Sequence, residues 1–203
     1  SGGTSQSLKS IFFYNSLTGY IAGNGGVIIK TTNGGVNWTS LSTGTLTNLT
    51  GIHFPTPDTG YAIGTSLTLK TTNGGTSWTS LPANSGSSIF FSTGLKGLST
   101  DNTHYLSKTS DGGTFWSVNT APGNPVNQFA ESFINANTGW TTGAGNKAYK
   151  TTNAGNNWVT QTNSATAFAV FYGIDFTDEL NGYIAGYSGF FYGDSSMIYK
   201  TSN

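Results

Sequence analysis

The nonapeptide KTTNGGVNW, residues 30–38, decides the fold of this 203-residue chain because close copies of it recur in phase along the sequence. The copies are KTTNGGTSW at 70–78, KTSDGGTFW at 108–116 and KTTNAGNNW at 150–158, and a fifth begins at Lys200. Repetition at roughly 40 residues is typical of architectures in which each repeat is one supersecondary unit. The stretch therefore has an architectural role before any chemical one.

Other side chains recur at fixed positions ahead of each nonapeptide. A phenylalanine is followed six residues later by a glycine, and the next residue is large. The three columns are Phe13, Phe54, Phe91, Phe133 and Phe176; Gly19, Gly60, Gly97, Gly139 and Gly182; and Tyr20, Tyr61, Leu98, Trp140 and Tyr183. The first unit reads as four short strands at 10–15, 20–23, 26–32 and 37–42, separated by Gly and Asn. No segment shows a sustained helical period, so almost no helix is expected.

Four strands in a unit of roughly 40 residues are typical of one blade of a β-propeller. We therefore predict an all-β fold, a β-propeller of four-stranded antiparallel blades with about five blades in this chain. Residues 1–203 are expected to form a single propeller segment. Its repeat units span approximately 10–42, 51–82, 88–120, 130–162 and 173–203, and the last lacks its outer strand.

The two ends of the chain do not coincide with blade boundaries, which leaves two interpretations. In the first, which we favour, the chain is part of a larger ring of about six to eight blades, completed by further blades or domains of the same polypeptide. In the second, the five units nearly close on themselves, and Gly2, Gly3, Thr4 and Ser5 replace the half of the nonapeptide that the fifth unit lacks.

Each nonapeptide, called the box below, is expected to form the tight turn between the third and fourth strands of a blade. The Asn or Asp accepts backbone N–H groups of the turn, the second glycine supplies a positive φ, and the Trp folds over the turn. These structural residues are Asn33, Gly35, Trp38, Asn73, Gly75, Trp78, Asp111, Gly113, Trp116, Asn153, Gly155 and Trp158.

The box resembles the Asp-box, or bacterial neuraminidase repeat, with the pattern Ser/Thr-x-Asp-x-Gly-x-x-x-Trp. The wider wording, in which GYIAG precedes KTTNGG and Trp, is similar to photosystem II assembly-factor propellers and to repeats of secreted bacterial proteins. The resemblance covers the whole chain and implies the propeller fold, but Asp boxes occur in sialidases, xyloglucanases, sortilins and non-enzymatic scaffolds alike. Three of the four complete boxes carry Asn, whose amide oxygen still accepts the turn hydrogen bonds, so a structural role is expected.

The composition excludes several classes of function. Eight lysines balance eight acids, there is no arginine, and only 8% of residues are charged, which argues against nucleic acid. There is no cysteine for a disulfide or a thiolate metal site, and no apolar run approaches the ~20 residues that cross a bilayer. We expect no cofactor, no metal and no membrane insertion. The chain shows no signal sequence, but its Ser- and Thr-rich composition suits an extracellular or cell-surface protein.

Catalytic residues are not evident in the sequence. The resemblance to sialidases implies an arginine cluster for the substrate carboxylate, and the absence of arginine disfavours that activity. His53 and Asp175 fall in a variable column of the innermost strand and are candidates to line the central channel. The five lysines at the start of the boxes are interpreted as solvated stems rather than as a binding ring.

Propeller ligands usually meet the face built from the loops between the second and third strands (b–c loops) and the links between blades (d–a links), with the boxes on the other face. The b–c loop of the fifth unit expands to AGYSGFFYGDSSM, residues 185–197. Loops on a rigid scaffold commonly carry function. The candidate binding residues are therefore Tyr187, Phe190, Phe191, Tyr192 and Asp194, and the secondary candidates in a d–a link include Asn124, Pro125, Asn127 and Phe129.

The function expected from the sequence is that of a non-catalytic propeller, a rigid binding or display module for a protein or glycan partner that meets the loop face. One alternative is a segment of a glycan-processing, glycoside hydrolase-like propeller enzyme, which needs two facing carboxylates. A second alternative is a chaperone like the photosystem assembly factors.

Overall fold

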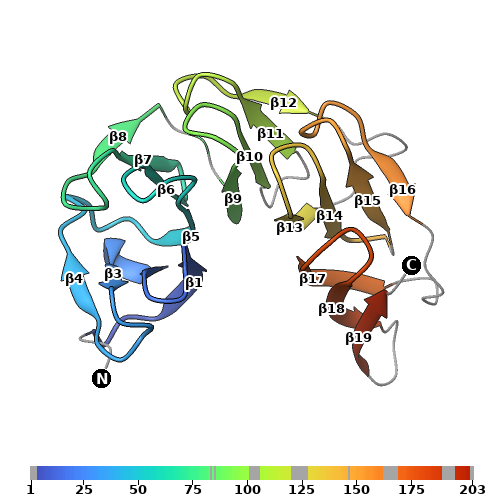
Figure 1. Cartoon of the computed structure of the whole chain (residues 1–203), viewed down its shortest axis with the longest axis horizontal. Coiled ribbons are helices and arrows are strands. Elements are labelled where there is room, and N and C mark those ends of the chain that lie inside the picture. Colours follow the sequence, from blue (N-terminus) through green and yellow to red (C-terminus); the bar gives the residue numbers. More distant parts are fainter. Residues whose placement is uncertain are drawn as a thin grey trace. The chain divides into compact units, whose positions relative to one another are not determined.

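The computed structural model describes residues 4–82, 84, 86–100, 106–119, 128–145, 147–161, 169–188 and 195–201. The strands of these residues form five antiparallel sheets that follow one another along the chain (Figure 1). They confirm the predicted all-β propeller fold, and each sheet is one blade. The helical content of the described residues is one 3-10 turn, η1 (Asn24–Gly26).

Four of the blades have four strands, ordered along the sheet as along the chain. The first has β1 (Leu8–Phe13), β2 (Gly19–Gly23), β3 (Ile28–Thr31) and β4 (Thr39–Leu41), and the second has β5 (Leu49–His53), β6 (Gly60–Gly64), β7 (Leu67–Thr71) and β8 (Thr79–Leu81). The third has β9 (Ser88–Phe91), β10 (Gly97–Thr100), β11 (Leu106–Thr109) and β12 (Ser117–Asn119), and the fourth has β13 (Gln128–Phe133), β14 (Gly139–Gly143), β15 (Ala148–Thr151) and β16 (Val159–Gln161).

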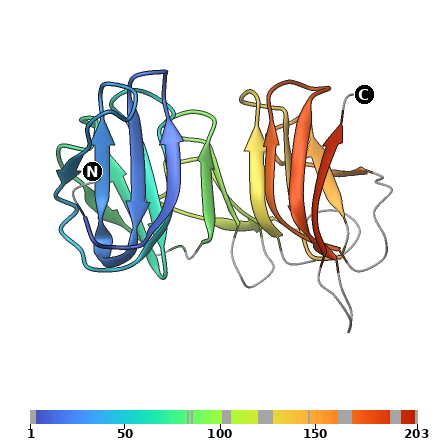
Figure 2. The same cartoon turned by 90° about the horizontal axis from the view of Figure 1, so that it is seen from below.

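The fifth blade has three strands among the described residues, β17 (Ala169–Phe176), β18 (Gly182–Ser188) and β19 (Ser195–Thr201). Figure 2 shows these strands, drawn in orange-red, side by side. They are longer than their counterparts because β18 and β19 stay paired as far as Ser188 and Ser195, on either side of the expanded b–c loop.

The chain divides into two compact units. Unit 1 comprises Ser1–Gly97 and Thr109–Trp116, and unit 2 comprises Leu98–Lys108 and Ser117–Asn203. Each unit contains joints between successive blades.

Aromatic stacking holds successive blades together. The large side chain that follows the first glycine of the second strand lies flat on the phenylalanine of the next blade. In the second and third blades this phenylalanine meets its own box Trp edge to face. The stacked pairs are Tyr20 on Phe54 at 3.7 Å between ring centroids, Tyr61 on Phe91 at 3.5 Å, and Trp140 on Phe176 at 3.8 Å. Burial of such large rings makes these joints a main source of stability.

Four of the five box lysines are half-buried rather than solvated as the sequence suggested, namely Lys30, Lys70, Lys108 and Lys150, whereas Lys200 is exposed. Lys30 Nζ donates a hydrogen bond of 3.0 Å to the Gly74 carbonyl in the next box. Four ammonium groups lie over the aromatic ring of their own blade: Lys30 over Tyr20 at 5.2 Å, Lys70 over Tyr61 at 5.4 Å, Lys150 over Trp140 at 5.0 Å and Lys200 over Tyr183 at 5.9 Å.

A buried threonine organises each box turn together with the Asn or Asp. In the first box the Thr31 hydroxyl donates to Asn33 Oδ1 at 3.0 Å and accepts the Gly35 N–H, while Asn33 Oδ1 also accepts the Asn37 N–H at 2.9 Å. The same pattern recurs around Asn73, Asp111 and Asn153, with the threonine at most 2% exposed: Thr31, Thr71, Thr109 and Thr151.

Residue 154 is the only box position where alanine takes the place of glycine, and its φ is +57°. The left-handed conformation costs a residue with a Cβ about 1 kcal/mol, so Ala154→Gly is expected to raise the free energy of unfolding by about 1 kcal/mol. Urea unfolding measures this change. Gly34→Ala, at the matching position with φ +69°, is the reciprocal control and should lower stability by a similar amount. A neutral or destabilising Ala154→Gly substitution would contradict the prediction.

Candidate functional site

In four of the blades, a β-bulge in the innermost strand places one extra residue near the b–c loop end of the sheet. The register shifts lie between Leu8 and Ser10, Leu49 and Gly51, Gln128 and Ala130, and Phe171 and Gly173. The extra residues are therefore Lys9, Thr50, Phe129 and Tyr172. Bulges re-aim side chains and are common beside functional sites.

Phe129, Tyr172 and Tyr187 gather into one aromatic cluster in unit 2. The Phe129 and Tyr172 rings lie 4.9 Å apart at 37°, and the Tyr172 and Tyr187 rings lie 5.8 Å apart at 22°. Tyr172 is 54% exposed, so the cluster is open to solvent. Partial desolvation raises the pKa of Tyr172, and a hydrogen bond with Tyr187 raises it further. Tyr172 is therefore neutral at physiological pH.

Gly186 allows the close backbone approach that positions this cluster. A Cβ at Gly186 would lie 2.1 Å from the Val170 carbonyl oxygen and 2.8 Å from the Phe171 Cα, so the strand next to the bulge requires glycine. An isolated bridge between Ala144 and Val170 ties the fourth blade to the fifth at the same end of the strands. The aromatic cluster thus sits on rigid backbone rather than on a loop.

Of the predicted binding residues, the structure places Tyr187 in this cluster. Phe190, Phe191, Tyr192 and Asp194 lie outside the described residues, as do Asn124, Pro125 and Asn127. Phe129, predicted as a secondary candidate, belongs to the cluster, whereas Tyr172 was not singled out from the sequence. The sequence does hold a signal for Tyr172. The position of the bulge residue is Lys9 and Thr50 in the first two blades and becomes aromatic in the fourth and fifth.

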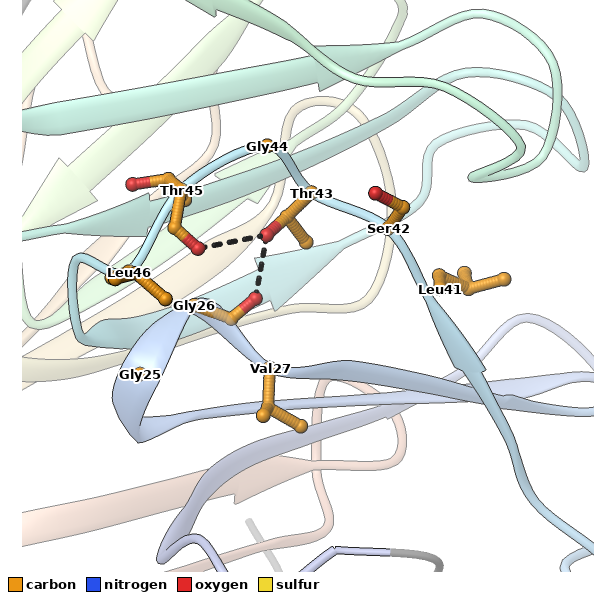
Figure 3. Close-up of a pocket in the computed structure, with 9 residues that line it drawn as sticks. All are labelled: Gly25, Gly26, Val27, Leu41, Ser42, Thr43, Gly44, Thr45 and Leu46. Atoms are coloured by element: carbon orange, nitrogen blue, oxygen red, sulfur yellow. Dashed lines mark hydrogen bonds between the residues drawn. The ribbon is translucent and has the colours of Figure 1, made fainter.

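A shallow pocket of about 470 Å³ lies at the b–c and d–a end of the first blade, within unit 1 (Figure 3). The Thr43 hydroxyl donates to the Gly26 carbonyl at 2.7 Å and ties the link to the b–c loop. Leu46 is 87% exposed at its rim. The lining carries no ionisable side chain: Gly25, Gly26, Val27, Leu41, Ser42, Thr43, Gly44, Thr45 and Leu46. The pocket therefore suits an uncharged group and has nothing for acid–base chemistry.

The two channel candidates occupy different environments. The His53 ring lies between Phe12 at 4.5 Å and Phe90 at 4.8 Å, and its Nδ1 accepts the Phe91 N–H at 3.3 Å. Desolvation by burial lowers the pKa of His53 to about 3, so the ring is neutral and holds neighbouring blades together. Asp175, on β17, is exposed.

Two carboxylates of the described residues are held in turns by hydrogen bonds. Hydrogen bonds from the Phe115 N–H and the Thr109 hydroxyl hold the pKa of Asp111 below its usual range, and those from Asn181 and the Leu180 N–H do the same for Asp178. Both acids thus stabilise turns. Within the described ranges no three His, Asp or Glu side chains gather as metal ligands, and no helix is long and apolar enough to cross a membrane.

No protein-family model and no curated protein matches the chain. Among solved structures, it is similar to YCF48 from Cyanidioschyzon merolae, at 16% identity and TM-score 0.69 over 93% of this chain and 69% of that one. It is also similar to YCF48 bound to D1 peptide, at 15% identity and TM-score 0.54 over 91% and 92% of the two chains.

An ancestral GH74 enzyme is similar at 20% identity and TM-score 0.75, covering all of this chain, which spans 31% of the length of that enzyme. Identities this low show the fold alone. Because an enzyme and a peptide-bound protein share this fold, the similarity does not decide between catalysis and binding. The chain is thus a β-propeller whose structural neighbours are YCF48 and GH74 propellers.

Proposed function

We propose that this chain belongs to a non-catalytic Asp-box propeller, extracellular or on the cell surface, that binds a protein partner through the aromatic cluster of Phe129, Tyr172 and Tyr187. The observation that carries the proposal is the cluster itself, which is exposed, uncharged and mounted on paired strands. Aromatic side chains of this kind dominate the energetics of protein interfaces.

Three further features support binding rather than catalysis. The cluster and the pocket of the first blade are both built from uncharged side chains. Phe190, Phe191 and Tyr192 follow Tyr187 closely in the sequence, so this stretch of the chain is rich in aromatic residues. YCF48, a structural neighbour, is known bound to a peptide. The Ser- and Thr-rich, sparsely charged composition supports the extracellular setting.

Tyr172→Ala is expected to weaken binding of a partner peptide at least about tenfold, since truncation of an aromatic hot-spot residue typically costs 2 kcal/mol or more. Random peptides displayed on phage, selected against the whole chain, would supply the ligands, and calorimetry would measure their affinities. The control variant is Phe115→Ala, which removes an aromatic side chain that is 70% exposed on a box turn.

Selected peptides whose affinity falls with Tyr172→Ala and not with Phe115→Ala would support the proposal. Peptides equally sensitive to both changes would reject the site. An array of neutral oligosaccharides, tested in parallel, covers the glycan alternative. If no peptide is selected, and the wild-type protein binds an oligosaccharide that the Tyr172→Ala variant does not bind, the partner is a carbohydrate rather than a protein.

A further inference from the structure

Four asparagines of the chain are followed directly by a glycine: Asn24, Asn33, Asn73 and Asn181. In such a pair the backbone nitrogen of the glycine can attack the side-chain carbonyl carbon of the asparagine, because a residue without a Cβ leaves that nitrogen accessible. The attack needs a carboxamide and a glycine N–H that are free to meet. The hydrogen bonds at each pair therefore decide which asparagine is modified.

The box turn holds both reacting groups of its pair. In the first box, Asn33 Oδ1 accepts the Thr31 hydroxyl at 3.0 Å and the Asn37 N–H at 2.9 Å. The Gly34 N–H donates to the Leu17 carbonyl at 2.9 Å. The second box repeats all three hydrogen bonds. Both box pairs are therefore restrained at the carboxamide and at the glycine nitrogen.

The pair at the start of β18 is restrained in a different way. Asn181 Nδ2 donates to both carboxylate oxygens of Asp178, at 3.1 and 3.0 Å. Gly182 is buried in a strand that pairs on both sides, with Phe176 of β17 and with Thr201 of β19. The Asn181 carboxamide and the Gly182 nitrogen are therefore not free to meet either.

Asn24, which begins the 3-10 turn η1, is the exception. Its backbone is fixed, since its N–H donates to the Ser7 carbonyl at 2.9 Å. Among the residues that the structure describes, however, none forms a hydrogen bond with its carboxamide. The Gly25 N–H is held by one bond of 2.9 Å to Oδ1 of Asn48, an exposed residue. Rotation of one side chain thus frees the glycine nitrogen next to an unrestrained carboxamide.

We propose that Asn24 is a site of spontaneous deamidation in the folded protein, and that the box turns protect Asn33 and Asn73 from the same reaction. The Gly25 nitrogen forms a bond to Asn24 Cγ, and the carboxamide C–N bond breaks. The amide leaves as ammonia, which takes up the proton of the Gly25 N–H. Water then opens the cyclic imide at either carbonyl, which restores the N–H and leaves aspartate or isoaspartate at position 24.

The modification changes the b–c loop of the first blade. Either product places a negative charge directly before Gly25 and Gly26, which line a pocket without ionisable side chains. Isoaspartate also lengthens the main chain of η1 by one carbon and removes the carbonyl that accepts the Val27 N–H at 3.4 Å. The reaction therefore alters both the charge and the shape of this pocket.

Peptide mapping of the whole chain after storage in mildly alkaline buffer tests the proposal. Because the chain has no arginine, trypsin cleaves after lysine alone, and the four pairs fall in four different peptides: 10–30, 31–70, 71–96 and 151–200. Mass spectrometry follows the conversion of amide into acid in each peptide. In the folded protein Asn24 should deamidate at least about tenfold faster than Asn33 or Asn73, since more hydrogen bonds must break in the boxes.

Two variants test the role of the one bond at the Gly25 nitrogen. Asn48→Ala removes its acceptor and should raise the rate at Asn24 about fivefold, the effect of one hydrogen bond. Asn37→Ala is the matched control. It changes another exposed asparagine, one that takes part in the first box through its backbone N–H, and should leave the rate at Asn24 as in wild type.

The same chain unfolded in urea is the reference, because there the four pairs should react at similar rates. Preferential reaction of Asn24 in the folded protein, accelerated by Asn48→Ala and not by Asn37→Ala, would support the proposal. Equal rates at Asn24, Asn33 and Asn73 in the folded protein would overturn it. So would an Asn24 that stays intact when the unfolded chain has reacted, or an Asn48→Ala variant with the wild-type rate.

Discussion

Tyr61→Ala is expected to lower the free energy of unfolding by about 4 kcal/mol, the size found when large buried aromatic side chains are truncated. Tyr61 is fully buried, stacks on Phe91 at 3.5 Å with 6° between the planes, and donates a hydrogen bond of 2.7 Å to the Gly94 carbonyl. Desolvation, with a smaller effect of the Asp111 charge, raises its pKa to about 12. The substitution removes a joint between blades and leaves a cavity there.

Two variants separate the components of this loss in urea unfolding at low protein concentration. Tyr61→Phe keeps the stack and removes the hydrogen bond to Gly94, so it should cost about 1 kcal/mol. Tyr183→Ala removes the same side chain at the same position of the fifth blade, where it is 48% exposed, and should cost less than about 1 kcal/mol. Equal losses at Tyr61 and Tyr183 would show that stacking between blades does not stabilise the protein.

The stability of the protein is expected to fall by about 2 kcal/mol on acidification from about pH 7.5 to about pH 5 through His53 alone. The pKa of His53 is about 3 in the folded protein against 6.5 in the unfolded chain. Between these values the unfolded state binds a proton that the folded state does not. The contribution of His53 to the free energy of unfolding is therefore complete above its pKa of 6.5 in the unfolded chain, and it is lost progressively as the pH falls towards 3.

His53→Gln is the matched variant for this pH dependence. Its amide oxygen can accept the Phe91 N–H in place of Nδ1, and it does not titrate. Unfolding in urea at both pH values should show a smaller loss for this variant than for wild type, with His104 present in both proteins and cancelling. An identical loss in the two proteins would mean that the folded state accommodates the protonated ring between Phe12 and Phe90.

The repeating pattern of the sequence predicted the blades, but it did not predict the contacts between blades. The columns of Phe54 and Tyr20 were visible, whereas their stacking depends on how successive sheets pack. The lysine column looked solvated for the same reason: the acceptor of Lys30 is a carbonyl of Gly74, some 44 positions away in the chain. Because every residue has a backbone carbonyl, the sequence does not show which carbonyl is the acceptor, and the hydrogen bond of Lys30 could not be predicted.

The candidate site was predicted in part, through Tyr187 and Phe129. Tyr172 was not predicted because it lies in a strand, whereas binding residues on a rigid scaffold are expected mainly in loops. A bulge turns such a strand residue outward. Bulges arise from the pairing of two strands, and in the sequence they appear only as a repeat position at which the residue type varies. Thr31 and its equivalents belong to the box, but their hydrogen bonds to Asn33 and Gly35 could be seen only in the folded turn.

The lysine that reaches from one blade to the turn of the next has a consequence for how such chains change in evolution. Each complete repeat of about 40 residues brings its own lysine, phenylalanine and receiving turn, so a tandem duplication would supply contact surfaces on both sides of the new copy. Gain or loss of a whole repeat would then require no compensating substitutions elsewhere. Copy number would then be free to change, while the residues that face a neighbour would be constrained within every copy.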